Sequence, residues 1–147
     1  MGRIQIHYPE TTLYIHRIPI RITDLNYGNH LAHDVLVSIL HEARARFFKA
    51  YAMEEGDIDG MGILIVDLGV IYRSQVFYGQ TLEVEVAISD VASRGCDLVY
   101  RVSDQESGKL VATAKTGIVF FDYKKNCVVG IPESFKALIN KNGKPRE

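Results

Sequence analysis

The residues best suited to chemistry lie in one short segment, residues 24–34, which reads DLNYGNHLAHD. It brings a carboxylate, an amide and an imidazole close together at Asp24, Asn26 and His30. Helical periodicity begins directly after it, and the first turn of a helix has unpartnered N–H groups and a partial positive charge. A carbonyl oxygen that becomes negative during acyl transfer is stabilised by such groups. The segment could therefore polarise a thioester and direct a water at it.

Two kinds of local structure must position these residues. Asp, Asn and Gly are typical of tight turns, so residues 24–29 are expected to form a loop. Between Val35 and Tyr51 the apolar residues recur three or four positions apart, which predicts one helix near residues 32–53 with a single buried face. The residues of that face are Leu36, Ile39, Leu40, Ala43, Phe47, Ala50 and Tyr51.

Most of the remaining chain alternates with a period of two, which is typical of strands. The expected strands are 11–22, 63–76, 81–88, 97–102 and 110–121. The third of these alternates cleanly, and residues 106–109 (ESGK) join the last two as a hairpin. We expect a kink near Gly69, and a short helix from Pro132 to Ile139.

The order of elements predicts an α+β fold in one domain, residues 1–147. One long helix is expected to be wrapped by a curved, mainly antiparallel sheet of about five strands, with a short C-terminal helix. Such a sheet leaves an unpaired edge strand, which proteins usually cover. We therefore expect self-association as a homodimer or homotetramer.

Bulk composition excludes several classes of function. A formal net charge of -1 gives no electrostatic basis for binding nucleic acid. No apolar run approaches the roughly 20 residues of a membrane span, so no membrane insertion is expected. Cys96 and Cys127 form neither a disulfide framework nor a metal motif, which favours a reducing compartment and a cytoplasmic location.

The motifs together resemble the 4-hydroxybenzoyl-CoA thioesterase superfamily, the hotdog-fold acyl-CoA and acyl-carrier-protein thioesterases. The loop of that family reads Asp-x-Asp-x-x-x-His, and Asp24 and His30 fall on its first aspartate and its histidine. Residues 42–44 match the Glu-Ala-Arg of its helix, and residues 117–121 and 131–133 match its last strand and terminal helix start. The resemblance implies a hotdog fold and hydrolysis of an acyl thioester to acid and thiol. It implies no cofactor, with coenzyme A entering only as part of the substrate.

One departure from the family is Asn26, which stands where many relatives carry a second aspartate as base or nucleophile. Asparagine can neither accept a proton at neutral pH nor attack as a carboxylate. In a hydrolase the carboxylate would come from Glu42, Asp34 or Asp24. The alternative is a non-catalytic module that binds acyl-CoA in the same pocket.

In the hydrolase interpretation each candidate has a role. Asn26 orients the water or the thioester carbonyl, His30 and the helix-start amides stabilise the oxyanion, and Glu42 or Asp34 is the base. The expected substrate-binding residues are Tyr27, Gly28, Asn29, Tyr72 and Ser74. Structural roles compete with these: Asn26 suits a turn, Asp34 a helix-start acid, and Glu42 an exposed charge. Arg44 is expected to pair with an acid from the sheet or from a partner chain.

Two further interpretations are weaker. His30, His33 and Asp34 form a His-x-x-His-Asp pattern that could bind metal, but phosphohydrolases with such a pair are all-helical, and we expect no metal. A hotdog dehydratase acting on a hydroxyacyl thioester uses a differently placed histidine. Assaying thiol release from acyl-CoAs would separate the hydrolase from the binding module.

Overall fold

The structure is a computed structural model that describes residues 1–143. Its helices are α1 (His33–Ala50) and α2 (Glu133–Gly143), with a short 3-10 helix, η1 (Ile22–Asp24), before the loop. Its strands are β1 (Tyr14–Pro19), β2 (Gly62–Tyr72), β3 (Thr81–Ser89), β4 (Gly95–Asp104), β5 (Leu110–Asp122) and β6 (Cys127–Val129). These elements follow the order expected from the sequence, with β6 as one additional short strand.

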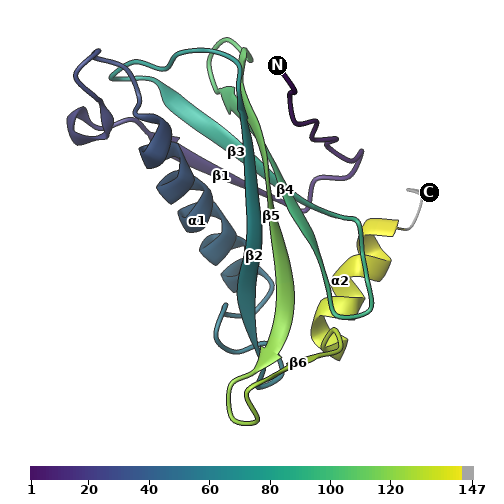
Figure 1. Cartoon of the computed structure of the whole chain (residues 1–147). Coiled ribbons are helices and arrows are strands. Elements are labelled where there is room, and N and C mark those ends of the chain that lie inside the picture. The colour runs from purple at the N-terminus through teal and green to yellow at the C-terminus, as the bar shows by residue number, and fades with distance from the viewer. Residues whose placement is uncertain (144–147) are drawn as a thin grey trace.

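The strands form one antiparallel sheet in the order β1-β3-β4-β5-β2, and β6 pairs with β5. The sheet curves around α1, which lies along its concave face (Figure 1). Among the described strands, β1 and β2 are the two edges of the main path. One long helix on the concave face of a curved antiparallel sheet confirms the predicted α+β architecture.

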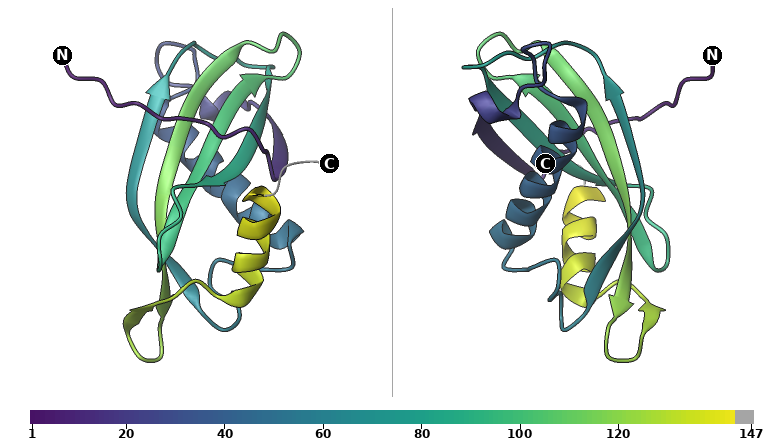
Figure 2. Two further views of the ribbon diagram at one scale, coloured as in Figure 1. Left: turned by 90° about the vertical axis from the view of Figure 1, so that its right-hand side faces the viewer. Right: turned by 60° about the vertical axis from the view of Figure 1, so that its left-hand side comes forward.

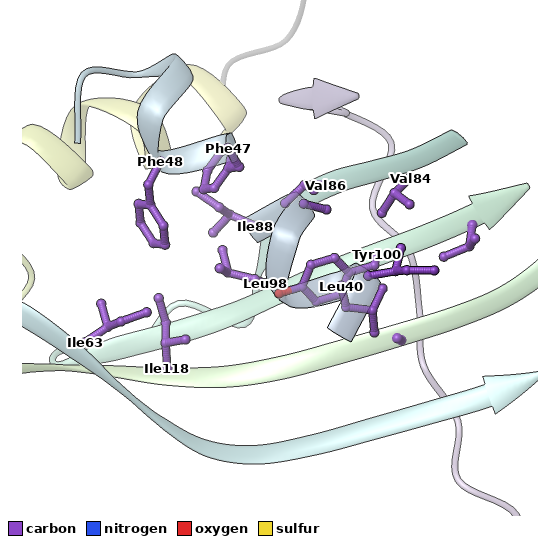
Figure 3. Packing of buried hydrophobic residues seen from close by; sticks show 14 of the residues in the cluster. Leu40, Phe47, Phe48, Ile63, Val84, Val86, Ile88, Leu98, Tyr100 and Ile118 are labelled. Atoms are coloured by element: carbon purple, nitrogen blue, oxygen red, sulfur yellow. The ribbon is translucent and has the colours of Figure 1, made fainter. Parts of the chain in front are cut away.

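The core lies between α1 and the concave face of the sheet. Phe47, Phe48 and Leu40 from α1 are fully buried, and they meet alternate residues of β3 and β4 such as Val86 and Leu98 (Figure 3). Alternation places these strand residues on one face because successive side chains point to opposite sides. The helical and strand periodicities of the sequence therefore describe the two halves of one core.

The short helix α2 closes the end of this core beyond the last turns of α1 (Figure 2). Its Phe135 is fully buried and packs against Phe48 of α1 and Phe120 of β5, with ring centroids 6.1 and 4.9 Å apart. These aromatic contacts exclude water at the C-terminal end of α1. The loop that carries the candidate residues lies at the opposite, N-terminal end of α1.

The irregularity in β2 lies at Val66 and not at Gly69, where the sequence suggested a kink. The register of β2 against β5 shifts between Ile65 and Asp67. Such a bulge lets the Asp67 carboxylate turn onto the neighbouring strand, where it accepts the backbone N–H of Gly117 at 2.9 Å. A side-chain carbon on residue 117 would meet that carboxylate oxygen at 2.6 Å, so a glycine is needed there.

Arg44 is a buried structural residue, as the sequence suggested, and it pairs with an acid from the connection after α1 instead of one from the sheet. Its Nε donates to Glu55 at 2.7 Å, and Glu55 lies in the connection between α1 and β2. Burying a guanidinium is tolerable only with such a partner. The pair fastens the second half of α1 to the connection that leads into β2.

Candidate functional site

The loop between η1 and α1 is closed by its own hydrogen bonds. Asn26 donates its backbone N–H to the carbonyl of His30 at 2.9 Å, and Asn29 donates back to the carbonyl of Asn26 at 3.0 Å. Asn29 has a φ of 63°, the left-handed conformation that asparagine tolerates better than most residues. The turn residues read from the sequence therefore reverse the chain and bring residues 26 and 30 together.

The side chain of Asn26 has a defined orientation. Its Oδ1 accepts the backbone N–H of Gly28 at 2.9 Å. An N–H group can only donate, so the atom facing it is the oxygen, and the amide nitrogen must lie on the other side. The oxygen of Asn26 thus holds the turn, as its structural interpretation expected, whereas the site role of its Nδ2 stays a prediction.

Gly28 lets Asn26 and His30 approach each other. A side-chain carbon on residue 28 would lie 3.1 Å from Nε2 of His30 and 3.2 Å from Oδ1 of Asn26. Both distances are tighter than ordinary van der Waals contact. The role of Gly28 that the structure supports is thus to leave room for the two polar side chains.

His30 faces a backbone carbonyl with one of its ring nitrogens. Its Nδ1 lies 3.4 Å from the carbonyl oxygen of Leu31. Because a carbonyl oxygen only accepts, this weak contact favours the tautomer with the proton on Nδ1. In the neutral ring, Nε2 is then a proton acceptor.

The start of α1 has no side-chain cap. Its N-cap residue is Ala32, and no side chain accepts a hydrogen bond from the first turn. The backbone N–H groups of residues 33–35 are therefore the unpartnered donors of a helix start. Asp34, in this first turn, is exposed to solvent.

Tyr72, the last residue of β2, reaches the same helix start. Its hydroxyl donates to the carbonyl oxygen of His33 at 2.7 Å, and the two rings are edge to face with centroids 6.5 Å apart. Burial raises the pKa of Tyr72, and the negative charge of Asp34 adds to that rise. The hydroxyl therefore remains protonated and able to donate near neutral pH.

These groups line a pocket of about 370 Å³. Four of the residues expected from the sequence are in its wall: Asn26, His30, Tyr72 and Ser74. Ser74 donates its hydroxyl to the carbonyl of Leu110 at 2.8 Å, which joins the chain after β2 to the start of β5. The remaining lining residues are Leu31, Ala32, His33, Leu36, Arg73, Gln75, Val76 and Val111.

Most of those additional residues had no site role predicted from the sequence. Leu36 belonged to the apolar stripe of the helix, and His33 entered only the metal interpretation. Val76 and Val111 are far apart in the sequence. Leu31 donates its N–H to the carbonyl of Val76, and the carbonyl of Val111 accepts the N–H groups of Arg73 and Ser74. Only tertiary pairing could have revealed them.

Two of the candidate carboxylates lie elsewhere. Asp24 and Glu42 line a second pocket, of about 350 Å³, between η1 and the other side of α1. Glu42 pairs with Arg46 one turn further along the helix, at 3.4 Å. The structure therefore separates both carboxylates from the pocket of Asn26 and His30.

Asp24 is engaged in a local structure of its own. It is 3% exposed and accepts the backbone N–H of Arg21 at 2.8 Å and its guanidinium at 3.0 Å. Burial alone would raise the pKa of Asp24, but these hydrogen bonds and the Arg21 charge outweigh it and lower the pKa. Asp24 thus anchors the entry to the loop as a carboxylate.

The loop residues Tyr27 and Asn29 are exposed and are absent from the wall of the pocket that Asn26 and His30 line. Their predicted role in substrate binding stays a prediction.

Among residues 1–143 no three His, Cys, Asp or Glu side chains are grouped so as to hold a metal ion. In the same part of the chain no helix has the length and apolarity of a bilayer span.

Several solved structures of other proteins are similar to this chain over most of its length. A 1,4-dihydroxy-2-naphthoyl-CoA thioesterase from Synechocystis is 16% identical and superposes with a TM-score of 0.80, over 90% of this chain and 98% of that one. A protein from Staphylococcus aureus, solved in complex with CoA, is 17% identical with a TM-score of 0.81, over 97% and 92%. A putative thioesterase from Pseudomonas aeruginosa is 20% identical with a TM-score of 0.81, over 88% and 99%. These similarities confirm the hotdog fold.

The family of the chain follows from comparison with known sequences. None of the curated proteins matches this sequence. The profile of the thioesterase-like superfamily matches residues 20–139, which include the candidate loop, α1 and every strand after it. The chain therefore belongs to the thioesterase-like superfamily, which confirms the resemblance carried by its loop and helix motifs and the expectation of a thioesterase-like enzyme.

Proposed function

We propose that this protein hydrolyses an acyl-CoA thioester to the free acid and coenzyme A. The observation that carries the proposal is the pocket in which Asn26 and His30 face the uncapped start of α1. Amide donors and helix-start N–H groups are the groups that stabilise an acyl oxyanion. The membership of the thioesterase-like superfamily supports the same reaction.

Nδ2 of Asn26 and the N–H groups of residues 33–35 receive the thioester carbonyl oxygen. A water attacks the carbonyl carbon and gives a proton to Nε2 of His30, which forms a tetrahedral oxyanion held by those donors. The oxyanion collapses, the carbon–sulfur bond breaks, and the departing thiolate takes the proton from His30. The products are the acid and the thiol, and His30 returns to its neutral form.

His30 replaces a carboxylate as the base in this scheme. Asp24 and Glu42 line a different pocket and are already ion-paired. The charge of Asp34 contributes to the raised pKa of Tyr72. Asp34 is, however, exposed in the first turn of α1, where the helix dipole favours a carboxylate. Asp34 is therefore the one carboxylate that competes with His30 for this role.

The acyl group is proposed to enter the apolar part of the pocket, formed by Leu31, Leu36, Val76 and Val111. A volume of about 370 Å³ is at the small end of the range for small-molecule sites, which favours a compact acyl group. Coenzyme A is proposed as the carrier because a similar hotdog structure was solved with CoA bound.

The proposed assembly is a homodimer formed along β2. This edge strand has exposed apolar side chains at Ile65 and Leu68 on the face towards α1, where they line a hollow with Val37 and His41. An unpaired edge with such residues is a template for pairing with another strand. A second copy would cover both the edge and the hollow.

A non-catalytic acyl-CoA-binding module is the second candidate, and Asn26 favours it. This residue replaces the aspartate that resemblance to the family leads one to expect, and part of its hydrogen-bonding capacity is used by Gly28. The two candidates differ in turnover. A binding module would retain acyl-CoA in equilibrium dialysis and release no thiol.

The test is thiol release from a panel of acyl-CoAs by the purified protein and three variants. His30→Gln is expected to reduce turnover by about 10²–10⁴, the usual contribution of a general base. Glu42→Gln is the matched control and is expected to retain activity. If Asp34→Asn abolishes turnover and His30→Gln does not, Asp34 is the base. Wild-type protein that binds acyl-CoA without releasing thiol would make the binding module the correct function.

A further inference from the structure

Arg73 carries a permanent positive charge in the wall of the pocket that Asn26 and His30 line. The residues that line this pocket are all described in the structure, and none of them is an aspartate or a glutamate. The wall therefore holds a guanidinium without a carboxylate to balance its charge. Hydrolysis as proposed above uses Asn26, His30 and the start of α1, and it leaves Arg73 without a role.

Arg73 lines this pocket because the chain leaves the regular alternation of β2 at that residue. Tyr72, the last residue of β2, reaches α1 at the carbonyl of His33, so strict alternation would send the next side chain to the opposite face. Instead, the N–H groups of Arg73 and Ser74 both donate to the carbonyl of Val111, at 2.8 and 3.2 Å. Two residues set against one form a β-bulge, which re-aims side chains. Arg73 and Ser74 accordingly both line the pocket.

The backbone at Arg73 is fixed, whereas its side chain is free. Besides the two bonds to Val111, the hydroxyl of Ser74 donates to the carbonyl of Leu110 at 2.8 Å, which ties this segment to the start of β5. Arg73 is exposed, and its guanidinium makes no ion pair or hydrogen bond with any of residues 1–143. Most other arginines in that part of the chain are paired with a carboxylate: Arg17, Arg21, Arg44, Arg46 and Arg101. All the guanidinium donors of Arg73 are therefore available to a ligand.

The apolar part of the pocket borders Arg73, because the N–H group of Arg73 bonds to Val111 of that apolar wall. Asn26 and His30, which face the thioester carbonyl in the proposed reaction, belong to the loop before α1. An acyl chain with its carbonyl at that loop can pass over the apolar side chains and end at the guanidinium. The pocket thus suits an acyl group that is apolar in its middle and negatively charged at its far end.

The phosphates of coenzyme A are also anionic, but they lie far from the thioester. The pantetheine arm separates the sulfur from the first phosphorus by about 13 bonds, a span of roughly 15 Å when extended. Arg73 lines the same pocket of about 370 Å³ as Asn26, and a compact space of that volume is narrower than this span. The anionic group that reaches Arg73 therefore belongs to the acyl end of the substrate.

Asp34 is a negative charge that acts on the same region. Its carboxylate adds to the raised pKa of Tyr72, but Asp34 is exposed and is absent from the pocket wall. Interactions with an exposed charge are screened by water and salt, whereas a hydrogen-bonded ion pair in the wall acts at contact. The charge of Asp34 therefore weakens the attraction of an anion to Arg73 without reversing it.

We propose that the substrate is an acyl-CoA whose acyl group ends in a carboxylate, and that the guanidinium of Arg73 binds this carboxylate. The planar guanidinium donates two parallel N–H bonds to the two carboxylate oxygens, a geometry that a neutral acyl end cannot accept in the same way. Arg73 is then the residue that sets the specificity for a dicarboxylic half-thioester. This inference rests on the proposed hydrolysis and names its substrate class.

The test compares glutaryl-CoA with its methyl monoester, which has the same acyl chain without the charge. Wild-type kcat/KM for thiol release, corrected for spontaneous hydrolysis, is expected to be about 10–100-fold higher for glutaryl-CoA, the usual contribution of hydrogen bonds to a charged group. Arg73→Gln is expected to abolish this preference by lowering kcat/KM for glutaryl-CoA alone, and Arg73→Lys is expected to keep part of it. Because the preference is a ratio measured on one preparation, partial unfolding of a variant does not alter it.

Arg94→Gln is the matched control and is expected to keep the full preference. Arg94 is likewise exposed and has no ion pair among the described residues, and its carbonyl accepts the N–H of Phe120 near the opposite end of β5 from Val111. The variant therefore removes the same charge from a site remote from the pocket.

Equal wild-type kcat/KM values for the two thioesters overturn the proposal and leave the hydrolysis itself standing. If Arg73→Gln lowers kcat/KM equally for both thioesters but not for the corresponding acyl-pantetheines, Arg73 binds a phosphate of CoA, which also overturns the proposal. If no acyl-CoA releases thiol, the proposed hydrolysis fails, and equilibrium dialysis with the same two thioesters tests the role of Arg73. Tighter binding of glutaryl-CoA that Arg73→Gln abolishes would then support recognition of the carboxylate, and equal binding would overturn it.

Discussion

The hydroxyl of Tyr72 donates a hydrogen bond of 2.7 Å to the backbone carbonyl of His33. Tyr72 ends the edge strand β2 and His33 begins α1, so one hydrogen bond joins the proposed dimer edge to the helix start that faces the pocket. The bond therefore holds the end of β2 against the first residue of α1. The relationship makes Tyr72 a residue that positions the site.

Replacing Tyr72 with Phe is expected to lower kcat by about 3–10-fold, which corresponds to the usual net worth of one hydrogen bond. KM should change little, because the ring that lines the pocket is kept. Steady-state kinetics of thiol release will measure both constants. Tyr78→Phe, at an exposed tyrosine outside the pocket, is the control; a rise in KM with unchanged kcat would assign Tyr72 to substrate binding instead.

Asn26→Ala is expected to reduce turnover by about 10²–10³, about 3–4 kcal/mol of barrier, because it removes a donor to the oxyanion. Asn26→Asp replaces that donor with an acceptor and adds a negative charge where the oxyanion forms, so it should also lower activity. If the wild type is inactive and Asn26→Asp releases thiol, the native protein is the binding module.

Gly28→Ala is expected to impair hydrolysis while leaving the fold stable. The new methyl group would press on Nε2 of His30 and Oδ1 of Asn26, which must move apart by a few tenths of an ångström. Gly56→Ala is the matched control, since a methyl group at residue 56 meets nothing within 4 Å. Thermal unfolding and thiol release should be measured on both; equal activities would show that the spacing of the two side chains is not critical.

Asp24 makes the stability of the protein depend on acid pH. Its pKa is lower in the folded chain than in the unfolded chain, where an aspartate titrates near its ordinary value of about 3.9. The stabilisation from Asp24 is therefore complete above that ordinary value and is lost as pH falls through the lowered folded pKa. Urea unfolding at pH 7 and near pH 3 should show a smaller loss of stability on acidification for Asp24→Asn than for wild type. An equal loss would show that Asp24 does not contribute.

Residue types and their spacing were enough to predict the elements of the fold and the chemical groups of the site. Apolar residues three or four apart can form one face only on a helix, and alternating residues can do so only on a strand, so α1 and β3 are readable without coordinates. Turn chemistry likewise located the loop, because Asn29 and Gly28 are suited to conformations and approaches that other residues resist.

Which of the candidates share a pocket depends on how the strands pair and how the helix packs on them. Asp24 is two residues from Asn26 in the sequence, yet it lies with Glu42 in another pocket, while Tyr72 and Val111 join Asn26 from distant strands. The bulge at Val66 was equally hidden, because it is a feature of the pairing of β2 with β5, on which the Asp67 carboxylate reaches Gly117. Local periodicity reports only which face of an element a residue occupies. The distance between side chains on different elements is set by strand pairing and by the direction in which α1 crosses the sheet.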